Sequence, residues 1–400
     1  MGVRAVLGRP LALVACGGLL LSGCARFDDP VAGQTFEPAP ELTAPAGPQP
    51  ELPEVGGSGP SPGRPGGAPN SVPPPDGCTD FDRAVIATCL DTVSAVAALP
   101  GDGTRLTALA GERRSGRVML VGRGQGGGVE QTEIARLEVD AAGDGGLTGL
   151  ALSPSYAEDR LVFAYVTTTT DNRVVRFAQG QPPKPVLTGI PKAASGNRGA
   201  LLTGPDGALL VATGDAGDPE AAADPGSLAG KVLRIDTSGE PAKGNPTAGS
   251  RVLARGLHAP GGLCAAADGQ RLWVTDRAPG KDVLHRVPTG GDVVPVWSWP
   301  ERPGVAGCVD WGDVVAVAAT GDGNLQNVPV TGDGTANGKP VVSMDGRNNA
   351  GYGRLTGISP VTPDLALVGT ANKDGGDPVS SDDRVVVISR QQNVPGGGRD

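Results

Sequence analysis

Histidine and aromatic residues are the scarcest components of this 400-residue sequence. Only His258 and His285 are present, which excludes histidine-rich metal centres. Aromatic residues make up 3% of the chain, so any core must consist mainly of valine, leucine and alanine. No CxxC pair, HExxH or P-loop motif occurs, and no GxSxG nucleophile elbow, since the GPSPG of residues 59–63 lies in a Pro-rich stretch without strand or helix periodicity. The sequence therefore gives no support for zinc, Ser/His hydrolase or nucleotide chemistry of those kinds.

Positive charge is also in deficit. The chain has 34 Lys and Arg against 43 Asp and Glu, a formal net charge of −9. A phosphate backbone would be repelled by such a surface, so we expect no nucleic-acid partner. Oligomeric state is left open, because no coiled-coil pattern or extended apolar helix is present.

The N-terminus has the pattern of an export signal. Arg4 and Arg9 precede an apolar run over residues 11–21, which is too short for a membrane-spanning helix. The run ends in LSGC, a lipobox in which Cys24 would receive the lipid. We expect a lipoprotein signal peptide over residues 1–23 and anchoring of Cys24 at the outer face of the cell membrane. An ordinary cleaved signal peptide is the alternative.

Composition divides the rest of the chain. Residues 24–77 are rich in Pro, Gly, Glu and Ser without apolar periodicity, which predicts a disordered linker between the anchor and the folded part. The folded domain is expected over residues 78–392, with a disordered tail over 393–400. Proline (38 residues) is concentrated in this linker, whereas glycine (65 residues) recurs along the whole chain, where it favours turns.

Four cysteines remain after Cys16 and Cys24 are assigned to the signal and the lipid. An even number in an exported domain predicts two disulfides, for which three pairings exist. We favour Cys78–Cys89 as a local loop and Cys264–Cys308 as a link between consecutive repeats, with free buried thiols as the alternative.

Short apolar runs follow Gly/Asp/Pro turns throughout the folded part, with almost no helical period. Six such units recur about every 50 residues, a period that suits four-stranded propeller blades. We therefore predict an all-β, six-bladed β-propeller in which the strands after the turns line the hub. A pair of β-sandwiches would not explain six similar units. The Gly-rich run at 122–127 precedes a strand-like segment and is interpreted as a hairpin loop.

Several segments, in order, carry a family resemblance: GDGGLTGLALSPSYAEDRLVFAYVT, NRVVRF, the stretch Gly196–Asp236 and RGLHAPGGLCAAADGQRLWVTDRAPG. They resemble the soluble quinoprotein glucose/sorbosone dehydrogenases, over about residues 88–389. The resemblance implies a propeller that oxidises sugars with pyrroloquinoline quinone (PQQ) and calcium. In that family a His-x-Gly-Gly or His-x-Gly-Ser run supplies the catalytic base, an Arg-Asn pair contacts the cofactor, and a Gly-Pro turn helps to hold calcium.

Only some of the family's functional residues are kept at the matching positions of this sequence. The base position is Gly196, and glycine cannot act as a base. The Arg-Asn pair becomes His258-Ala259, which lacks the guanidinium fork. The acid after the strand is kept as Asp215, and a family Gln or Glu becomes Asp144.

Further residues could hold the cofactor and the ion. The calcium turn becomes Ala278-Pro279, whose backbone carbonyls remain available. Arg347, Arg354 and Lys373 are the candidates for binding the PQQ carboxylates. The acidic stretch Asp215, Asp218, Glu220 and Asp224 could hold calcium, with a solvated loop as the alternative.

Two function hypotheses result. The first is a lipid-anchored member that has lost PQQ-dependent catalysis and binds a glycan, an envelope component or a protein. The second is an active PQQ- and calcium-dependent aldose dehydrogenase with a rearranged site, in which Asp215 or His258 is the base. Asp215 could equally form a turn, and Asp144 could cap the Gly145-Gly146 turn. Whether the chain is an enzyme is left open at this point.

Overall fold

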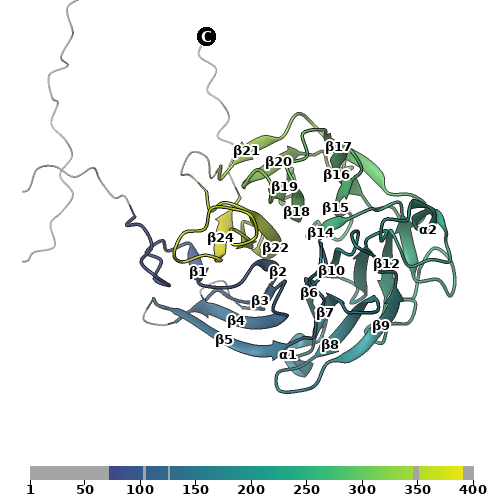
Figure 1. Ribbon diagram of the computed structural model, residues 1–400. Coiled ribbons are helices and arrows are strands. Elements are labelled where there is room, and N and C mark those ends of the chain that lie inside the picture. Colours follow the sequence, from purple (N-terminus) through teal and green to yellow (C-terminus); the bar gives the residue numbers. More distant parts are fainter. Residues whose placement is uncertain (1–71, 102–104, 125–126, 346–350, 391–400) are drawn as a thin grey trace, which may run out of the picture. The chain divides into compact units, whose positions relative to one another are not determined.

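The computed structural model describes residues 72–101, 105–124, 127–345 and 351–390. They lie within the second of two compact units, Ala68–Asp400. Twenty-four strands form six four-stranded antiparallel sheets, arranged as blades around a central axis (Figure 1). The predicted six-bladed β-propeller is confirmed.

Five blades are built from four consecutive strands, ordered from the axis outward. Blade 1 contains β2 (Val93–Ala98), β3 (Thr107–Glu112), β4 (Arg117–Arg123) and β5 (Val129–Arg136). Blade 2 contains β6 (Leu147–Leu152), β7 (Val162–Thr167), β8 (Asn172–Phe177) and β9 (Lys184–Ile190). Blade 3 contains β10 (Gly199–Thr203), β11 (Leu209–Thr213), β12 (Lys231–Ile235) and β13 (Val252–Arg255). Blade 4 contains β14 (Pro260–Ala265), β15 (Leu272–Ala278), β16 (Lys281–Arg286) and β17 (Val294–Trp299). Blade 5 contains β18 (Val305–Asp310), β19 (Val314–Ala319), β20 (Asn324–Pro329) and β21 (Val341–Ser343).

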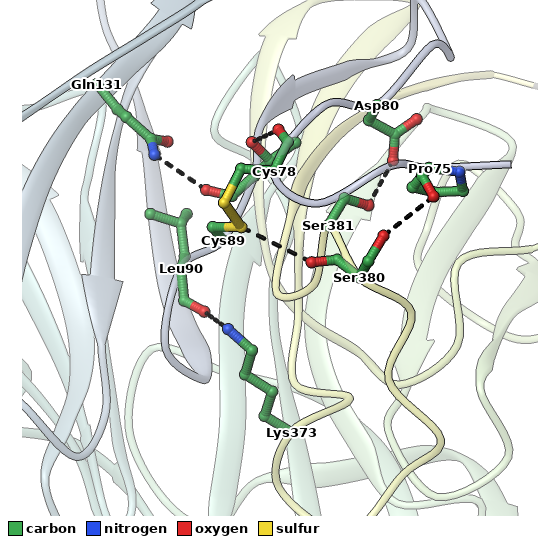
Figure 2. The surroundings of a disulfide bond; sticks show 10 residues. Pro75, Cys78, Asp80, Cys89, Leu90, Gln131, Lys373, Ser380 and Ser381 are labelled. Carbon is green, nitrogen blue, oxygen red and sulfur yellow. Dashed lines mark hydrogen bonds between the residues drawn. A yellow bond between two sulfur atoms is a disulfide. The ribbon is translucent and has the colours of Figure 1, made fainter.

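The sixth blade closes the ring with strands from both ends of the domain. Its order is β22 (Leu355–Thr362), β23 (Leu365–Thr370), β24 (Val385–Ser389) and β1 (Val85–Ala87), so the N-terminal strand is outermost. Figure 2 shows how the segment before β1 is fastened to this blade. Ser380 Oγ donates to the Pro75 carbonyl (3.0 Å) and Ser381 Oγ to Asp80 (2.8 Å). These bonds tie the start of the domain to its last blade.

The six sequence repeats coincide with the first hairpin of each blade, and the turn chemistry explains them. In blade 3 the Asp206 carboxylate accepts from the Ala208 N–H (3.1 Å), which fixes the turn between β10 and β11. One detail of the prediction is wrong: the strand after each turn is the second strand, and the strand before it lines the axis. Both strands are apolar because blades pack face to face, so the repeat pattern alone cannot distinguish them.

The inner strands form a closed ring, in which each contacts the inner strand of the next blade. Small residues allow this approach. At Gly307 on β18 a Cβ would lie 2.3 Å from the Ile358 nitrogen of β22, so only glycine fits. The buried clusters lie between successive blades; Phe163 and Leu209, for example, pack together between blades 2 and 3.

Two short helices lie in loops: α1 (Tyr156–Asp159) and α2 (Pro219–Ala223). Within the described ranges, no helix is long and apolar enough to cross a membrane. The predicted signal peptide, Cys24 and the C-terminal tail lie outside the described residues, as does the linker up to residue 71.

Both expected disulfides are present in the structure. Cys78 and Cys89 close a loop before β1, and Cys264 on β14 is joined to Cys308 on β18. The second bond links the inner strands of blades 4 and 5, where both cysteines are buried.

Candidate active site in the cup above the channel

The sequence-predicted site residues come together at one end of the channel. Asp144, Gly196 and His258 each lie two or three residues before an inner strand, β6, β10 and β14 respectively. All inner strands of a propeller start at the same face, so these loops of blades 2, 3 and 4 surround one opening. We call this region the cup.

Asp215 and His258 form a hydrogen-bonded pair in the cup. Nδ1 of His258 lies 2.8 Å from Oδ2 of Asp215, and the Asp215 N–H donates to the His258 carbonyl at 2.8 Å. The other carboxylate oxygen of Asp215 accepts from the Gly217 N–H (2.7 Å). Asp215 therefore forms a turn through one oxygen and orients the imidazole through the other.

The backbone of the His258 loop is held by a second carboxylate. Asp276, on β15, is fully buried and accepts from the N–H groups of His258 (3.1 Å) and Ala259 (2.7 Å). Burial raises the pKa of Asp276 to about 6, while these two N–H groups oppose the shift. The imidazole of His258 is thus fixed through both its ring and its main chain, and its side chain remains 30% exposed.

Gly196 has no room for a side chain. Its φ is +73°, and a Cβ would lie 2.8 Å from Oδ1 of Asp215 and 2.9 Å from the Ala216 nitrogen. The space into which a residue at position 196 would project is occupied by the 215–217 turn. A side chain at position 196 would therefore require the 215–217 turn to move.

Asp144 serves the same loop. Its carboxylate accepts from the N–H groups of Gly196 (3.0 Å) and Asn197 (3.2 Å) and from the Asn197 side-chain amide (3.2 Å). Asp144 thus holds the entry to β10 in place from the neighbouring blade, instead of capping its own Gly145-Gly146 turn.

The predicted calcium turn is the β15–β16 hairpin. Ala278 ends β15 and pairs with Lys281, with Pro279 in the turn between them. Across the described ranges, no group of three or more His, Cys, Asp or Glu residues is arranged to hold a metal ion. The acidic stretch is used locally: Asp218 caps α2, and Asp224 accepts from the Gly226 N–H at 2.8 Å. Only backbone oxygens at the turn remain as the expected calcium ligands.

The structure places the three cations proposed for carboxylate binding in different situations. Arg347 lies outside the described residues. Lys373 donates to the Leu90 carbonyl (2.7 Å), next to the Cys78–Cys89 disulfide (Figure 2). Arg354 fits best, because its Nε is buried and has no hydrogen-bond partner in the part of the chain that the structure describes.

Two further arginines in this region were missed by sequence reasoning. Nε of Arg198 is also buried, again without a hydrogen-bond partner among the described residues. Arg277 donates to the carbonyls of Val305 (2.8 Å) and Gly304 (2.9 Å). The signal for Arg198 was its position in Gly196-Asn197-Arg198-Gly199, where the family run has glycine.

A separate cavity of about 540 Å³ lies at the opposite end of the channel, where the inner strands finish. Its walls are mostly aliphatic, for example Val96, Leu150 and Leu263. Asp310 is its one carboxylate, and it is already bound by Arg271 (2.9 Å) and Trp273 (2.7 Å). This cavity has no free group for acid–base chemistry, so the cup is the better candidate.

Comparison with known proteins gives a consistent picture. A family model described as glucose / sorbosone dehydrogenase matches residues 90–302. The PQQ-bound aldose sugar dehydrogenase of Streptomyces coelicolor is 31% identical, with a TM-score of 0.69, over 76% of this chain and 96% of that chain. A protein described as an oxidoreductase (glucose dehydrogenase) from Thermus thermophilus is 29% identical, with a TM-score of 0.67, over 76% of this chain and 98% of that chain.

Among curated relatives, quinoprotein glucose dehydrogenase B of Acinetobacter calcoaceticus is 24% identical over 263 residues. That match covers 56% of this chain and 53% of the relative. The chain thus spans about half the length of this relative.

Proposed function

Since the chain belongs to the glucose/sorbosone dehydrogenase family, whose relatives include PQQ-dependent enzymes, we propose that it is a sugar dehydrogenase whose catalytic base is His258. One observation carries this proposal: the 2.8 Å bond between His258 Nδ1 and Asp215 Oδ2. The family acid is kept, and an imidazole bound to it is supplied by the next blade in place of Gly196.

The proton chemistry follows from that bond. An ionised Asp215 only accepts, so His258 carries its proton on Nδ1 and leaves Nε2 as the basic nitrogen. Nε2 would take the proton of a sugar hydroxyl as hydride leaves the carbon that carries this hydroxyl. Asp215 then stabilises the imidazolium and holds its orientation, as the carboxylate does in other Asp–His pairs. Asp276 fixes the backbone from which the ring projects.

Two positively charged side chains make the cup suitable for an anionic cofactor. Arg354 and Arg198 each have a buried Nε without a hydrogen-bond partner among the residues that the structure describes, as expected of groups that bind a carboxylate of a ligand. PQQ, when bound, supplies the hydride acceptor. The carbonyls of Ala278 and Pro279 are the oxygens available to an accompanying calcium ion.

Location is a further part of the proposal. The lipobox and the Pro/Gly-rich linker support an exported protein that is anchored through Cys24 at the outer face of the cell membrane. A substrate would then be an extracytoplasmic sugar or an envelope glycan.

A binding module without turnover is the second candidate. It is favoured by Ala259, which replaces the amide of the family's Arg-Asn pair by a methyl group and whose N–H is committed to Asp276. In that case the cup would recognise a glycan, an envelope component or a protein.

The experiment is a PQQ titration of the purified domain, residues 72–400, with calcium. Quinone absorbance reports binding, and aldose-dependent dye reduction reports turnover. The proposal predicts both. Binding without turnover would support the second candidate, and absence of binding would remove the quinone from the function.

A further inference from the structure

Arginines from several blades converge on the cup. Arg113 follows β3, Arg198 precedes β10, Arg277 is on β15 and Arg354 precedes β22. Burial lowers the pKa of Arg198 and of Arg277; the charge of Arg113 lowers that of Arg198 further, and the charges of Arg198 and Arg354 lower that of Arg277 further. Such mutual effects require proximity, which residues of blades 1, 3, 4 and 6 can share only near the axis.

The charges of Asp144 and Asp374 raise the pKa of Arg198 against the effect of burial, but neither carboxylate is hydrogen-bonded to its guanidinium among the described residues. Asp144 is occupied by the N–H groups of Gly196 and Asn197. Asp374 forms ion pairs with Arg113 (2.9 Å) and with Arg114. Asp282, next to Arg277, accepts from the Gly304 N–H at 2.6 Å. In the part of the chain that the structure describes, Arg198 makes no ion pair, although its Nε is buried.

The Arg198 side chain is partly exposed, and its buried Nε has no hydrogen-bond partner among the described residues, which is unfavourable unless a ligand supplies an acceptor. We propose that Arg198, assisted by Arg354, binds a carboxylate of the ligand that occupies the cup. A guanidinium presents parallel N–H donors that match a carboxylate, so the preferred ligand carries that group. The carboxylate belongs either to an acidic sugar of the uronic-acid class or to PQQ. The inference rests on the cup being a ligand site but does not require His258 to be a base.

The position of Arg198 strengthens the inference. In the family run the corresponding residue is glycine, while arginine stands at the position of His258. This chain has histidine at 258 and arginine at 198, on adjacent loops of the cup. This chain thus has one histidine and one arginine on these two loops, each on the loop where the family has the other.

The test compares binding to the purified domain by calorimetry. D-galacturonate and D-galactose form one pair of probes, differing by the carboxylate, and PQQ is the third probe. The variant is Arg198→Gln, and the matched control is Arg160→Gln, which removes an exposed arginine between α1 and β7. Loss of one charge-assisted contact should weaken binding of the carboxylate ligand about 10-fold to 100-fold.

If the wild type prefers galacturonate to galactose and Arg198→Gln loses this preference, the contact of Arg198 is with an acidic sugar. Weaker PQQ binding in that variant, without a difference between the sugars, assigns it to the cofactor. Both results support the site. Unchanged affinities in Arg198→Gln, or no binding of any probe to the wild type, would overturn it.

Two measurements guard against misfolding of the variant. Arg198→Lys keeps the charge and should retain part of the affinity, and wild-type binding should weaken as sodium chloride is raised. An affinity that is independent of salt would contradict the proposal. A protein that binds carboxylates but never reduces a dye would leave this inference intact and refute the dehydrogenase activity.

Discussion

Nδ1 of His258 lies 2.8 Å from Oδ2 of Asp215, and the two residues belong to loops of consecutive blades. A second bond, from the Asp215 N–H to the His258 carbonyl, links the same loops at 2.8 Å. The pair is therefore a fixed element of the cup. Its geometry is that of a base and the carboxylate that orients it.

Asp215→Asn should separate orientation from binding. An asparagine amide facing Nδ1 would favour the other imidazole tautomer, so Nε2 would carry a proton and lose its basicity. We expect kcat of aldose oxidation to fall about 100-fold or more, with KM little changed. The control is Asp218→Asn on the same loop, which still caps α2 and should behave as wild type. A fall in both variants would indicate a disturbed loop.

Restoring a side chain at Gly196 should destabilise the domain. Gly180→Ala is the matched control, because its φ is +74° and a Cβ there meets nothing within 4 Å. That control should cost about 1–2 kcal/mol for the left-handed backbone alone. Gly196→Ala should cost at least about 1 kcal/mol more, because its Cβ would meet Asp215 and Ala216. Chemical denaturation measures the loss of unfolding free energy in each variant. Equal losses would mean that the 215–217 turn can move at little cost to make room for the Cβ.

His285 should make the fold sensitive to acid. Both of its ring nitrogens are buried and have no hydrogen-bond partner within the described ranges, and burial lowers its pKa to about 4 from 6.5. Below pH 6.5 the imidazole of His285 binds a proton in the unfolded chain but stays neutral in the folded state. The free energy of unfolding therefore falls as the pH decreases to about 4. This effect amounts to about 3 kcal/mol.

The variant His285→Leu should remove that pH dependence while filling the same buried site on β16. Its free energy of unfolding should exceed that of the wild type by more at about pH 4 than at about pH 7. A constant difference between the two proteins across this range would show that His285 does not titrate as inferred.

The two disulfides should contribute unequally. Cys264–Cys308 spans 44 residues and Cys78–Cys89 spans 11. In the chain-entropy description, their removal costs about 4 and about 3 kcal/mol respectively. Replacing each pair by alanine and comparing denaturation midpoints tests the order. A larger loss from the shorter loop would show that anchoring of the segment before β1 outweighs chain entropy.

The sequence was sufficient to predict the propeller because each blade repeats one local device, a turn between two apolar strands. It also brought Asp215 and His258 forward as separate candidates. Their contact could not be predicted, because it joins loops 43 residues apart through the packing of two blades. Arg198 was missed because its importance lies in the absence of a partner, which only the surrounding loops reveal.

Whether His258 has replaced the missing base is tested by aldose-dependent dye reduction by the PQQ-loaded domain, compared between wild type and His258→Gln. We expect turnover by the wild type and a loss of about 100-fold or more in the variant, with the same amount of PQQ bound. Equal turnover in the two proteins, or none in a wild type that has bound PQQ, would contradict this expectation.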